Sequence, residues 1–439
     1  MSEAAIGTPG TASAAEQEVR VRRRAIISSA VGNFVELYDF LIYGLFAAQI
    51  AANFFPKGDD TIALLQAFAI YGVGFFMRPV GAIVIGAYGD LKGRKNALVL
   101  TVGLMAVATA LTGLIPSYGS IGIAAPILLL LCRLVQGFST GGEWGGAATF
   151  LVEYSPPGKR GLIGSVQQFS VGVALIAGTL TAAVLNGWLS KEAMVEWGWR
   201  VPFLIGFVLA PIGLYLRARV HESPAYNRTV EKKQVARSPV LESLSTHRLP
   251  VLAAFGLSAI GTVGNYTYNI YLPTMATKTL NIAANAAYTS AVVAAIVLTI
   301  LTPVMGWLSD LIGRKPLLLG SAILYGLLSY PMFGYLTGTP DPTKLMLVQG
   351  FSAVLLAMYA GPLCAILAEL FPTKVRFTAL SIGYGMSVTL FGGFAPFIAQ
   401  YLIDTTKNPM SPSFFLIFAA IVSTITLLLL KDRTNGPLD

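Results

Sequence analysis

The sequence predicts an all-α integral membrane protein with twelve transmembrane helices in two six-helix, pseudo-symmetric bundles. First, 55% of its 439 residues are hydrophobic and 12% are charged, whereas a soluble globular chain carries about 25% charged residues. Second, apolar runs of about 20 to 30 residues recur along the chain, the length that a helix needs to cross a bilayer. Third, two motifs of the first half of the chain recur in the second half. The alternating segments of a membrane β-barrel, about ten residues each, do not occur.

The apolar runs give the positions of the expected spans. In chain order they are 26–54, 61–89, 97–116, 122–152, 162–187, 200–220, 249–275, 287–309, 316–336, 344–370, 377–403 and 411–431.

The basic residues predict how the chain is oriented. The net charge is +9, and with both termini in the cytosol most of the 30 Lys and Arg fall in cytosolic segments. Such a bias follows the positive-inside rule, so the charge reports topology and no nucleic-acid partner is expected. We expect a multi-pass protein of the plasma (inner) membrane, with both termini cytoplasmic and its basic segments near anionic lipid.

Several chemistries find no support in the sequence. Cys132 and Cys364 both lie within expected spans, where they are read as packing residues rather than a disulfide. The basic stretch before the first span lacks a convincing cleavage site and is read as the flank of an uncleaved span. We find no phosphate loop, metal-ligand cluster or nucleophile–base set, so no metal, cofactor or enzyme activity is expected.

Two repeated motifs divide the chain into halves. GAYGDLKGRK (86–95) matches GWLSDLIGRK (306–315) at six of ten positions, and EYSPPGKR (153–160) aligns with ELFPTKVR (369–376). Parallel six-span repeats suggest a transporter whose substrate site lies between the halves. The expected organisation is a tail at 1–25, a bundle at 26–220, a cytosolic linker at 221–248, a second bundle at 249–431 and a tail at 432–439.

These motifs resemble those of the major facilitator superfamily over essentially the whole chain. The narrower resemblance is to its metabolite:proton symporter family, which includes organic-acid and proline-betaine permeases. It rests on GNFVELYDFLIYG (32–44), FFMRPVGA (75–82), RLVQGFSTGGEWGGA (133–147), EYSPPGKRG (153–161) and WRVPF (199–203). The resemblance implies the twelve-helix major facilitator fold and transport by alternating access.

The repeated motifs also predict a gate on the cytosolic side. Asp90 ends a span, where its carboxylate can meet Arg94 or the positive N-terminus of another helix. The resemblance implies that this contact closes the cytosolic side, although Leu91 and Leu311 replace an Arg that many relatives carry. We expect Glu153 to pair with Arg160, and Glu369 with Arg376, in the same gate. The expected gate residues are Gly86, Asp90, Gly93, Arg94, Asp310, Gly313, Arg314, Glu153, Arg160, Glu369 and Arg376.

Four charged residues within spans are the candidates for proton coupling. Glu36 and Asp39 share one helical face in the first span, and Arg133 and Glu143 share one in the fourth. Ionisable residues inside a membrane are costly and usually functional. No histidine lies in a span, so the proton carrier must be a carboxylate or a chain of water molecules. We expect Asp39 and Glu36 to couple, with Arg133 as the switching counter-charge and Glu143 as a further candidate; which acid binds the proton stays open.

Polar side chains within spans are the candidates for substrate contact. Arg78 presents a fork that fits a carboxylate, or else pairs with Glu36 or Asp39. The second half carries no charge deep in a span, so it offers only hydrogen bonds. The candidates are Arg78, Tyr43, Gln136, Gln167, Gln168, Asn265, Tyr268, Asn269, Gln349, Tyr359 and Tyr384.

Together these features predict proton-coupled uptake of a small organic acid by a secondary active transporter that functions as a monomer. The first alternative is symport of a zwitterionic osmolyte such as proline or betaine. A drug/proton antiporter is less favoured, because the fifth span lacks the Gly-Pro pair of export subfamilies. A non-transporting sensor would need a signalling domain larger than the linker, and a proton-independent facilitator would leave Glu36 and Asp39 without a task.

Overall fold

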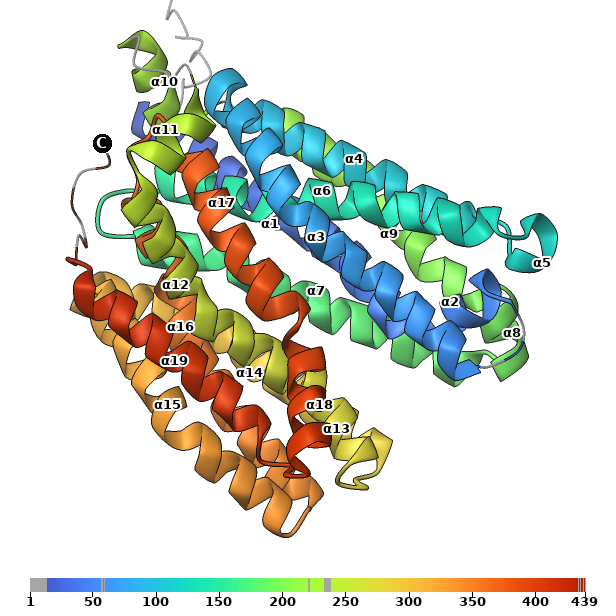
Figure 1. The fold of residues 1–439 in the computed structure, drawn as a ribbon. Coiled ribbons are helices and arrows are strands. Elements are labelled where there is room, and N and C mark those ends of the chain that lie inside the picture. The colour runs from blue at the N-terminus through green and yellow to red at the C-terminus, as the bar shows by residue number, and fades with distance from the viewer. Residues whose placement is uncertain are drawn as a thin grey trace, which may run out of the picture.

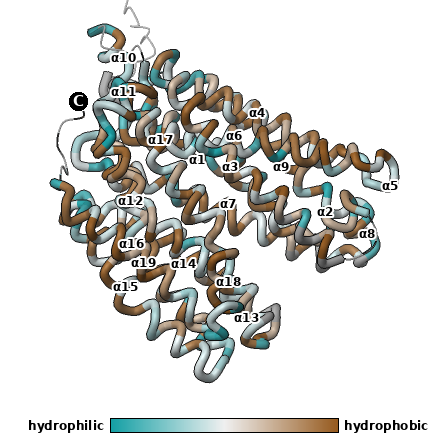
Figure 2. Tube along the Cα trace, in the orientation of Figure 1, coloured by the Kyte–Doolittle hydropathy of each residue, from teal (hydrophilic) through white to brown (hydrophobic). Residues whose placement is uncertain are grey.

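The chain is helical throughout the part that the structure describes. The structure is a computed structural model that describes residues 14–439, except 57, 59, 220, 221, 233–237, 433, 435, 437 and 439. Twelve of its helical segments are long and apolar enough to cross a membrane, which confirms the predicted fold class. Figure 2 shows hydrophobic residues along the shafts of these helices. The expected N-terminal tail lies outside the described residues up to position 13, as do positions within the linker and C-terminal tail.

The first half contains six long helices and several short ones between them. The long helices are α1 (Ala14–Leu45), α3 (Asp60–Lys92), α4 (Arg94–Leu114), α6 (Ala124–Glu153), α7 (Arg160–Trp188) and α9 (Val201–Ala218). The short ones are α2 (Ala47–Phe54), α5 (Tyr118–Ile121), α8 (Lys191–Glu196) and η1 (Gly198–Arg200). The expected first span, 26–54, is wrong in one respect: the backbone leaves helical geometry at Phe46, so α1 and α2 are separate helices.

The second half repeats this order, with two spans that contain a π-helical turn. The linker carries α10 (Pro224–Glu231) and α11 (Pro239–Ser245). The spans are α12 (Arg248–Asn265) with η2 (Tyr266–Tyr271) and α13 (Leu272–Lys278), α14 (Ala284–Ile312), α15 (Arg314–Gly338), α16 (Pro342–Glu369), α17 (Arg376–Ser387) with η3 (Val388–Gly393) and α18 (Ala395–Thr406), and α19 (Pro412–Leu429). The turns η2 and η3 are π-helical, a geometry that is frequent at functional sites.

The two bundles meet along several pairs of helices and diverge from one end to the other. Helices α3 and α6 pack on α17, and α7 packs on α14 and α16. Figure 1 shows the bundles close together at the end that carries α10 and α11, which we call the linker end. They separate toward the far end, which carries α5 and α8 on one side and α13 on the other.

Glycines permit the closest helix contacts within the first bundle. A Cβ atom on Gly137 of α6 would overlap the carbonyl group of Gly74 on α3, whereas a Cβ on Gly72 would meet nothing within 4 Å. Small residues let membrane helices approach in this way, because van der Waals packing rather than water exclusion holds such helices together.

We therefore expect Gly137→Ala to destabilise the protein and Gly72→Ala to leave its stability unchanged or slightly raised. Overpacking of a well-packed interface costs about 1–3 kcal/mol, while Ala favours a helix over Gly by about 1 kcal/mol. The melting temperature of the purified protein, followed by tryptophan fluorescence, measures both effects. Equal melting temperatures for the two variants would contradict the close α3–α6 contact.

Candidate functional site

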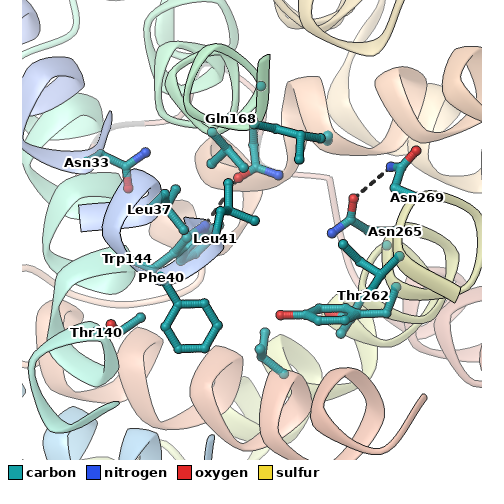
Figure 3. Close-up of a pocket in the computed structure, with 18 of the residues that line it drawn as sticks. Asn33, Leu37, Phe40, Leu41, Thr140, Trp144, Gln168, Thr262, Asn265 and Asn269 are labelled. Carbon is teal, nitrogen blue, oxygen red and sulfur yellow. Dashed lines mark hydrogen bonds between the residues drawn. The ribbon is translucent and has the colours of Figure 1, made fainter. Parts of the chain in front are cut away.

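A cavity lies between the two bundles, and both of them line it. Its walls come from α1, α3, α6 and α7 on one side and from α12, η2, α14, α16 and α17 on the other. Figure 3 shows Asn33, Gln168 and Trp144 facing Asn265, Asn269 and Thr262 across this space. The predicted place for the substrate site, between the halves, thus corresponds to a cavity.

Seven of the expected site residues lie on the wall of this cavity. They are Glu36, Arg78, Gln168, Asn265, Asn269, Tyr359 and Tyr384. Within this set, Asn269 Nδ2 donates to Asn265 Oδ1 at 2.9 Å. The wall therefore combines one cation and one carboxylate, both from the first bundle, with neutral polar groups from the two bundles.

Arg78 is a cation held by aromatic rings. Its guanidinium carbon lies 4.7 Å from the ring centre of Phe40 and 4.3 Å from that of Phe75. The side chain is buried, at 8% exposure, and it forms no ion pair with a carboxylate of the described residues. Cation–π contacts offset part of the cost of burying the charge. The guanidinium also shares a side-chain hydrogen bond with Tyr266, while its Nε atom has no hydrogen-bond partner among the described residues.

Three aromatic side chains on the cavity wall, Trp144, Tyr71 and Tyr266, were not anticipated as site residues, in contrast to Tyr359 and Tyr384. Trp144 of α6 stacks on Tyr384 of α17, with ring centres 3.5 Å apart and planes at 9°, and it donates to Gln168 Oε1 at 3.3 Å. Tyr71 and Tyr266 also line the cavity. Trp144 directly follows Glu143 in a polar stretch of its span, and this position was the sequence feature that could have identified it as a site residue. The stacked pair joins the two bundles.

Five substrate candidates lie outside the cavity lining, so their expected direct contact is corrected. The hydroxyl of Tyr43 donates to Ala67 O, and Gln167 exchanges hydrogen bonds with Asn33. Gln136 bonds Arg133 and Thr109, while Gln349 bonds Ser290 and the backbone of Tyr268. These residues are Tyr43, Gln136, Gln167, Tyr268 and Gln349. Buried polar groups in a membrane bundle must find partners. Here they find them mostly within one half, although Gln167 Oε1 also accepts from the thiol of Cys364 in the second half at 3.9 Å.

The four coupling candidates occupy three different places. Glu36 lines the cavity, and its Oε2 atom has no hydrogen-bond partner among the described residues. Asp39 and Arg133 are fully buried behind Phe40, whose ring centre lies 4.9 Å from the Arg133 guanidinium carbon. Glu143 bonds the hydroxyl of Thr101 on α4 and lies outside the cavity lining. The expected set is therefore dispersed, with the ring of Phe40 shared by Arg133 and Arg78.

At the linker end, each bundle places a carboxylate on the first turn of a helix in the other bundle. Asp90 Oδ2 accepts from the backbone N–H of Thr378 at 2.8 Å and from its hydroxyl at 2.7 Å. Asp310 accepts from the N–H groups of Gly161 and Leu162, both at 2.8 Å. These N–H groups lack partners within their own helices, and the helix dipole favours a negative charge there.

Ion pairs extend these contacts, with partners that differ from those expected. Glu153 pairs with Arg376 at 2.9 Å, and Arg160 pairs with Glu369 at 3.4 Å. The expected pairing of Glu153 with Arg160 and of Glu369 with Arg376, within each half, is therefore wrong. Each carboxylate crosses to the opposite bundle, because the two bundles face one another through equivalent surfaces.

The remaining gate residues lie in the same place. Arg94 contacts Asp90 at 3.0 Å and Glu153 at 3.5 Å, while Arg314 contacts Asp310 at 2.6 Å and Glu369 at 3.3 Å. Gly93 and Gly313 adopt φ values of 103° and 98°, which break the chain sharply between helices. Gly86 brings α3 against the backbone of Thr378.

The linker and the C-terminal segment also contact this network, which the sequence analysis missed. Glu222 accepts from the N–H of Lys95 at 3.1 Å, and burial raises the pKa of this carboxyl. In the second half, Thr434 Oγ1 accepts from the N–H of Arg314 at 3.1 Å. Gly436 O accepts from Arg160 Nη1 at 2.6 Å. The sequence feature that could have indicated these contacts is an acidic residue just beyond the last span of each half, Glu222 in the first and Asp432 in the second.

Twelve helices in two bundles, a central cavity and a network that closes one end define a membrane transporter of the major facilitator fold. Comparisons with known proteins agree. A family model described as "Sugar (and other) transporter" matches residues 25–245 and 227–438. The solved structure of the proton:xylose symporter XylE of E. coli gives a TM-score of 0.80 at 16% identity, covering 96% of this chain and 98% of that one.

Curated relatives are more similar in sequence. The chain is 35% identical to the citrate-proton symporter of Klebsiella pneumoniae, over 93% of this chain and 92% of the relative. It is also 35% identical to the proline/betaine transporter of Escherichia coli K12, over 95% and 85%. The chain therefore belongs to the sugar (and other) transporter family of the major facilitator superfamily, as a multi-pass membrane protein.

The gate geometry leads to a prediction for Asp90→Asn. Loss of the negative charge weakens a charge-assisted bond worth about 1.5–3 kcal/mol, so the linker end should open more often. Ser381, buried opposite Gly145, is replaced by cysteine as a reporter after Cys132 and Cys364 are changed to serine. We expect maleimide labelling at position 381 to be at least about fivefold faster in the Asn variant.

The control for this experiment is Asp341→Asn, which removes an exposed carboxylate that caps α16 at the far end. It should leave the labelling rate unchanged. If Asp90→Asn labels no faster than this control, Asp90 does not hold the linker end closed.

Proposed function

We propose that the chain is a proton symporter that takes up a small organic acid by alternating access. The acid is a di- or tricarboxylate of the size of citrate, and the protein acts as a monomer in the plasma (inner) membrane. Both termini and the linker face the cytosol. The bundles at 26–220 and 249–431, connected by the linker at 221–248, rock about the central cavity between them, with the tails at 1–25 and 432–439 outside the membrane.

The observation that carries this proposal is Arg78 on the cavity wall. It is a buried guanidinium without a carboxylate partner among the described residues, and it faces a cavity with polar groups on the opposite bundle. A planar fork of N–H donors suits a carboxylate, to which it can donate two bonds at once. The citrate-proton symporters among the relatives support an acid as the substrate.

In this proposal the described conformation is open toward the outside. The gate at the linker end is closed by Asp90, Asp310 and the crossed ion pairs, while the bundles diverge at the far end (Figure 1). Substrate enters from the far end and reaches Arg78. Protonation of Glu36 or Asp39, with Arg133 as counter-charge, then accompanies the change to the inward-open state, and Glu143 remains a further candidate.

A zwitterionic osmolyte is the second candidate substrate, and the aromatic wall favours it. Trp144, Tyr266 and Tyr384 offer ring faces or hydroxyls near Arg78, and aromatic rings bind quaternary ammonium groups by cation–π contact. The proline/betaine transporters among the relatives are consistent with this alternative. Arg78 would then hold the carboxylate of the zwitterion.

Ligand-dependent thermal stability of the purified protein separates the two substrates. A ligand that binds the folded state raises the melting temperature by mass action, by the equivalent of about 2.7 kcal/mol at a concentration 100 times its Kd. We expect stabilisation by citrate and related carboxylates. The shift should vanish in Arg78→Gln and persist in Lys344→Gln, a control at the exposed far end. Stabilisation by betaine or proline instead would replace the substrate assignment.

Replacing the acids by amides tests the coupling. Asp39→Asn and Glu36→Gln should abolish citrate accumulation driven by a pH gradient in proteoliposomes, while citrate exchange across the membrane continues. The reason is that a neutral amide cannot bind and release a proton, although it keeps the shape of the side chain. Full accumulation by both variants would remove the assigned coupling role.

A further inference from the structure

A chain of three hydrogen bonds connects Arg133 to Asp39 inside the first bundle. Arg133 Nη1 donates to Gln136 Oε1 at 2.6 Å, Gln136 Nε2 donates to Thr109 Oγ1 at 3.0 Å, and Thr109 Oγ1 donates to Asp39 Oδ2 at 2.8 Å. All four side chains are fully buried. No direct ion pair joins Arg133 and Asp39 within the described residues, so the two charges communicate through Gln136 and Thr109.

The chemistry of the groups fixes the direction of the first two bonds in this chain, and of the third while Asp39 is ionised. A guanidinium can only donate, so the oxygen of Gln136 must face Arg133 and its NH₂ group must face Thr109. The Thr109 hydroxyl then accepts from Gln136, and its single hydrogen is free to point at Asp39 Oδ2. While Asp39 is ionised, Oδ2 can only accept, so the Thr109 hydrogen points at it.

The other carboxylate oxygen of Asp39 has a different environment. Oδ1 has no hydrogen-bond partner among the described residues, although it is buried. It faces Gly206 of α9, where a Cβ atom would overlap it. A buried polar atom without a partner is costly, and glycine leaves at this position the space in which a hydrogen can sit.

We propose that Thr109 and Gln136 are positioning residues that select Oδ1 as the atom of Asp39 that takes up the proton. A hydrogen on Oδ2 would force the Thr109 hydroxyl to turn its own hydrogen away from the bond it donates to Asp39, whereas a hydrogen on Oδ1 leaves that bond intact. This inference rests on the proposed coupling role of Asp39. The relay lets Arg133 stabilise the ionised carboxylate from a distance and lets the proton arrive without breaking the chain.

The groups that face Asp39 from the neighbouring helices are consistent with this assignment. Arg133 of α6 and Tyr38 of α1 are the ionisable neighbours that interact with it. Tyr43 of α1 and Tyr71 of α3 make cation–π contacts with Arg133. Thr109 of α4 and Gly206 of α9 also contact Asp39, and neither has a titratable side chain. The hydroxyl of Tyr38 donates to Thr181 of α7.

Infrared difference spectroscopy tests the assignment without a substrate. Subtracting the spectrum of Asp39→Asn from that of the otherwise identical protein isolates the carboxyl band of Asp39, which is titrated with pH. With the proton on Oδ1, the C=O group is Oδ2 and accepts from Thr109, so Thr109→Val should move the C=O band to higher frequency. It should also raise the titration midpoint by about one pH unit, because one bond to the ionised form is lost.

Thr109→Ser keeps the hydroxyl and should reproduce both the band and the midpoint of the parent protein. A band that does not move in Thr109→Val would place the proton on Oδ2, and an unchanged midpoint would remove the relay; either result overturns the inference. Thr109→Ala removes the same hydroxyl if the valine variant does not fold. Failure of the proposed function is distinguishable, because it requires Asp39→Asn to retain pH-driven accumulation whatever the infrared result.

Discussion

The closed linker end depends on one interaction that occurs twice: a buried carboxylate of one bundle accepts backbone N–H bonds from the first helical turn of the other bundle. Asp90 does this on α17, and Asp310 does it on α7. Each bond satisfies donors that a helix cannot satisfy by itself, so separation of the bundles leaves both the carboxylate and the helix end to water. The crossed ion pairs of Glu153 and Glu369 then add charge complementarity around these two contacts.

Much of the fold could be predicted because its signals are local. Apolar length gives the spans, and the repeated motif around Asp90 and Asp310 gives the two halves and the gate. The partners at the gate could not be predicted, because the repeat relates Glu153 to Glu369 without stating whether each pairs within its own half. In a two-fold arrangement, each residue meets a residue of the other half, so Glu153 pairs with Arg376 and Glu369 with Arg160. This arrangement exists only once the two bundles are assembled.

The cavity was predicted less completely than the gate. Arg78 and Glu36 stand out because charge is rare in an apolar span, whereas Trp144 and Tyr266 resemble ordinary packing residues. Conversely, Tyr268 and Gln349 are polar and were expected at the site, but Gln349 forms its hydrogen bonds with Ser290 and the backbone of Tyr268, inside the second bundle. Helical periodicity says which side chains share a face, but it does not say whether that face meets the partner bundle, its own bundle or lipid.

The π-helical turns η2 and η3 have a consequence for how the far end can move. Each turn holds one residue more than an α-helix of the same length, and residues of both, Tyr266 and Val388, border the cavity. If the extra residue passes from the π-helical turn into the neighbouring helix, the helical segment beyond the turn rotates by about 100° and shifts by about 1.5 Å along the helix axis. A change of η2 or η3 to α-helical geometry would therefore turn α13 relative to α12, or α18 relative to α17, without requiring the linker end of the same span to rotate.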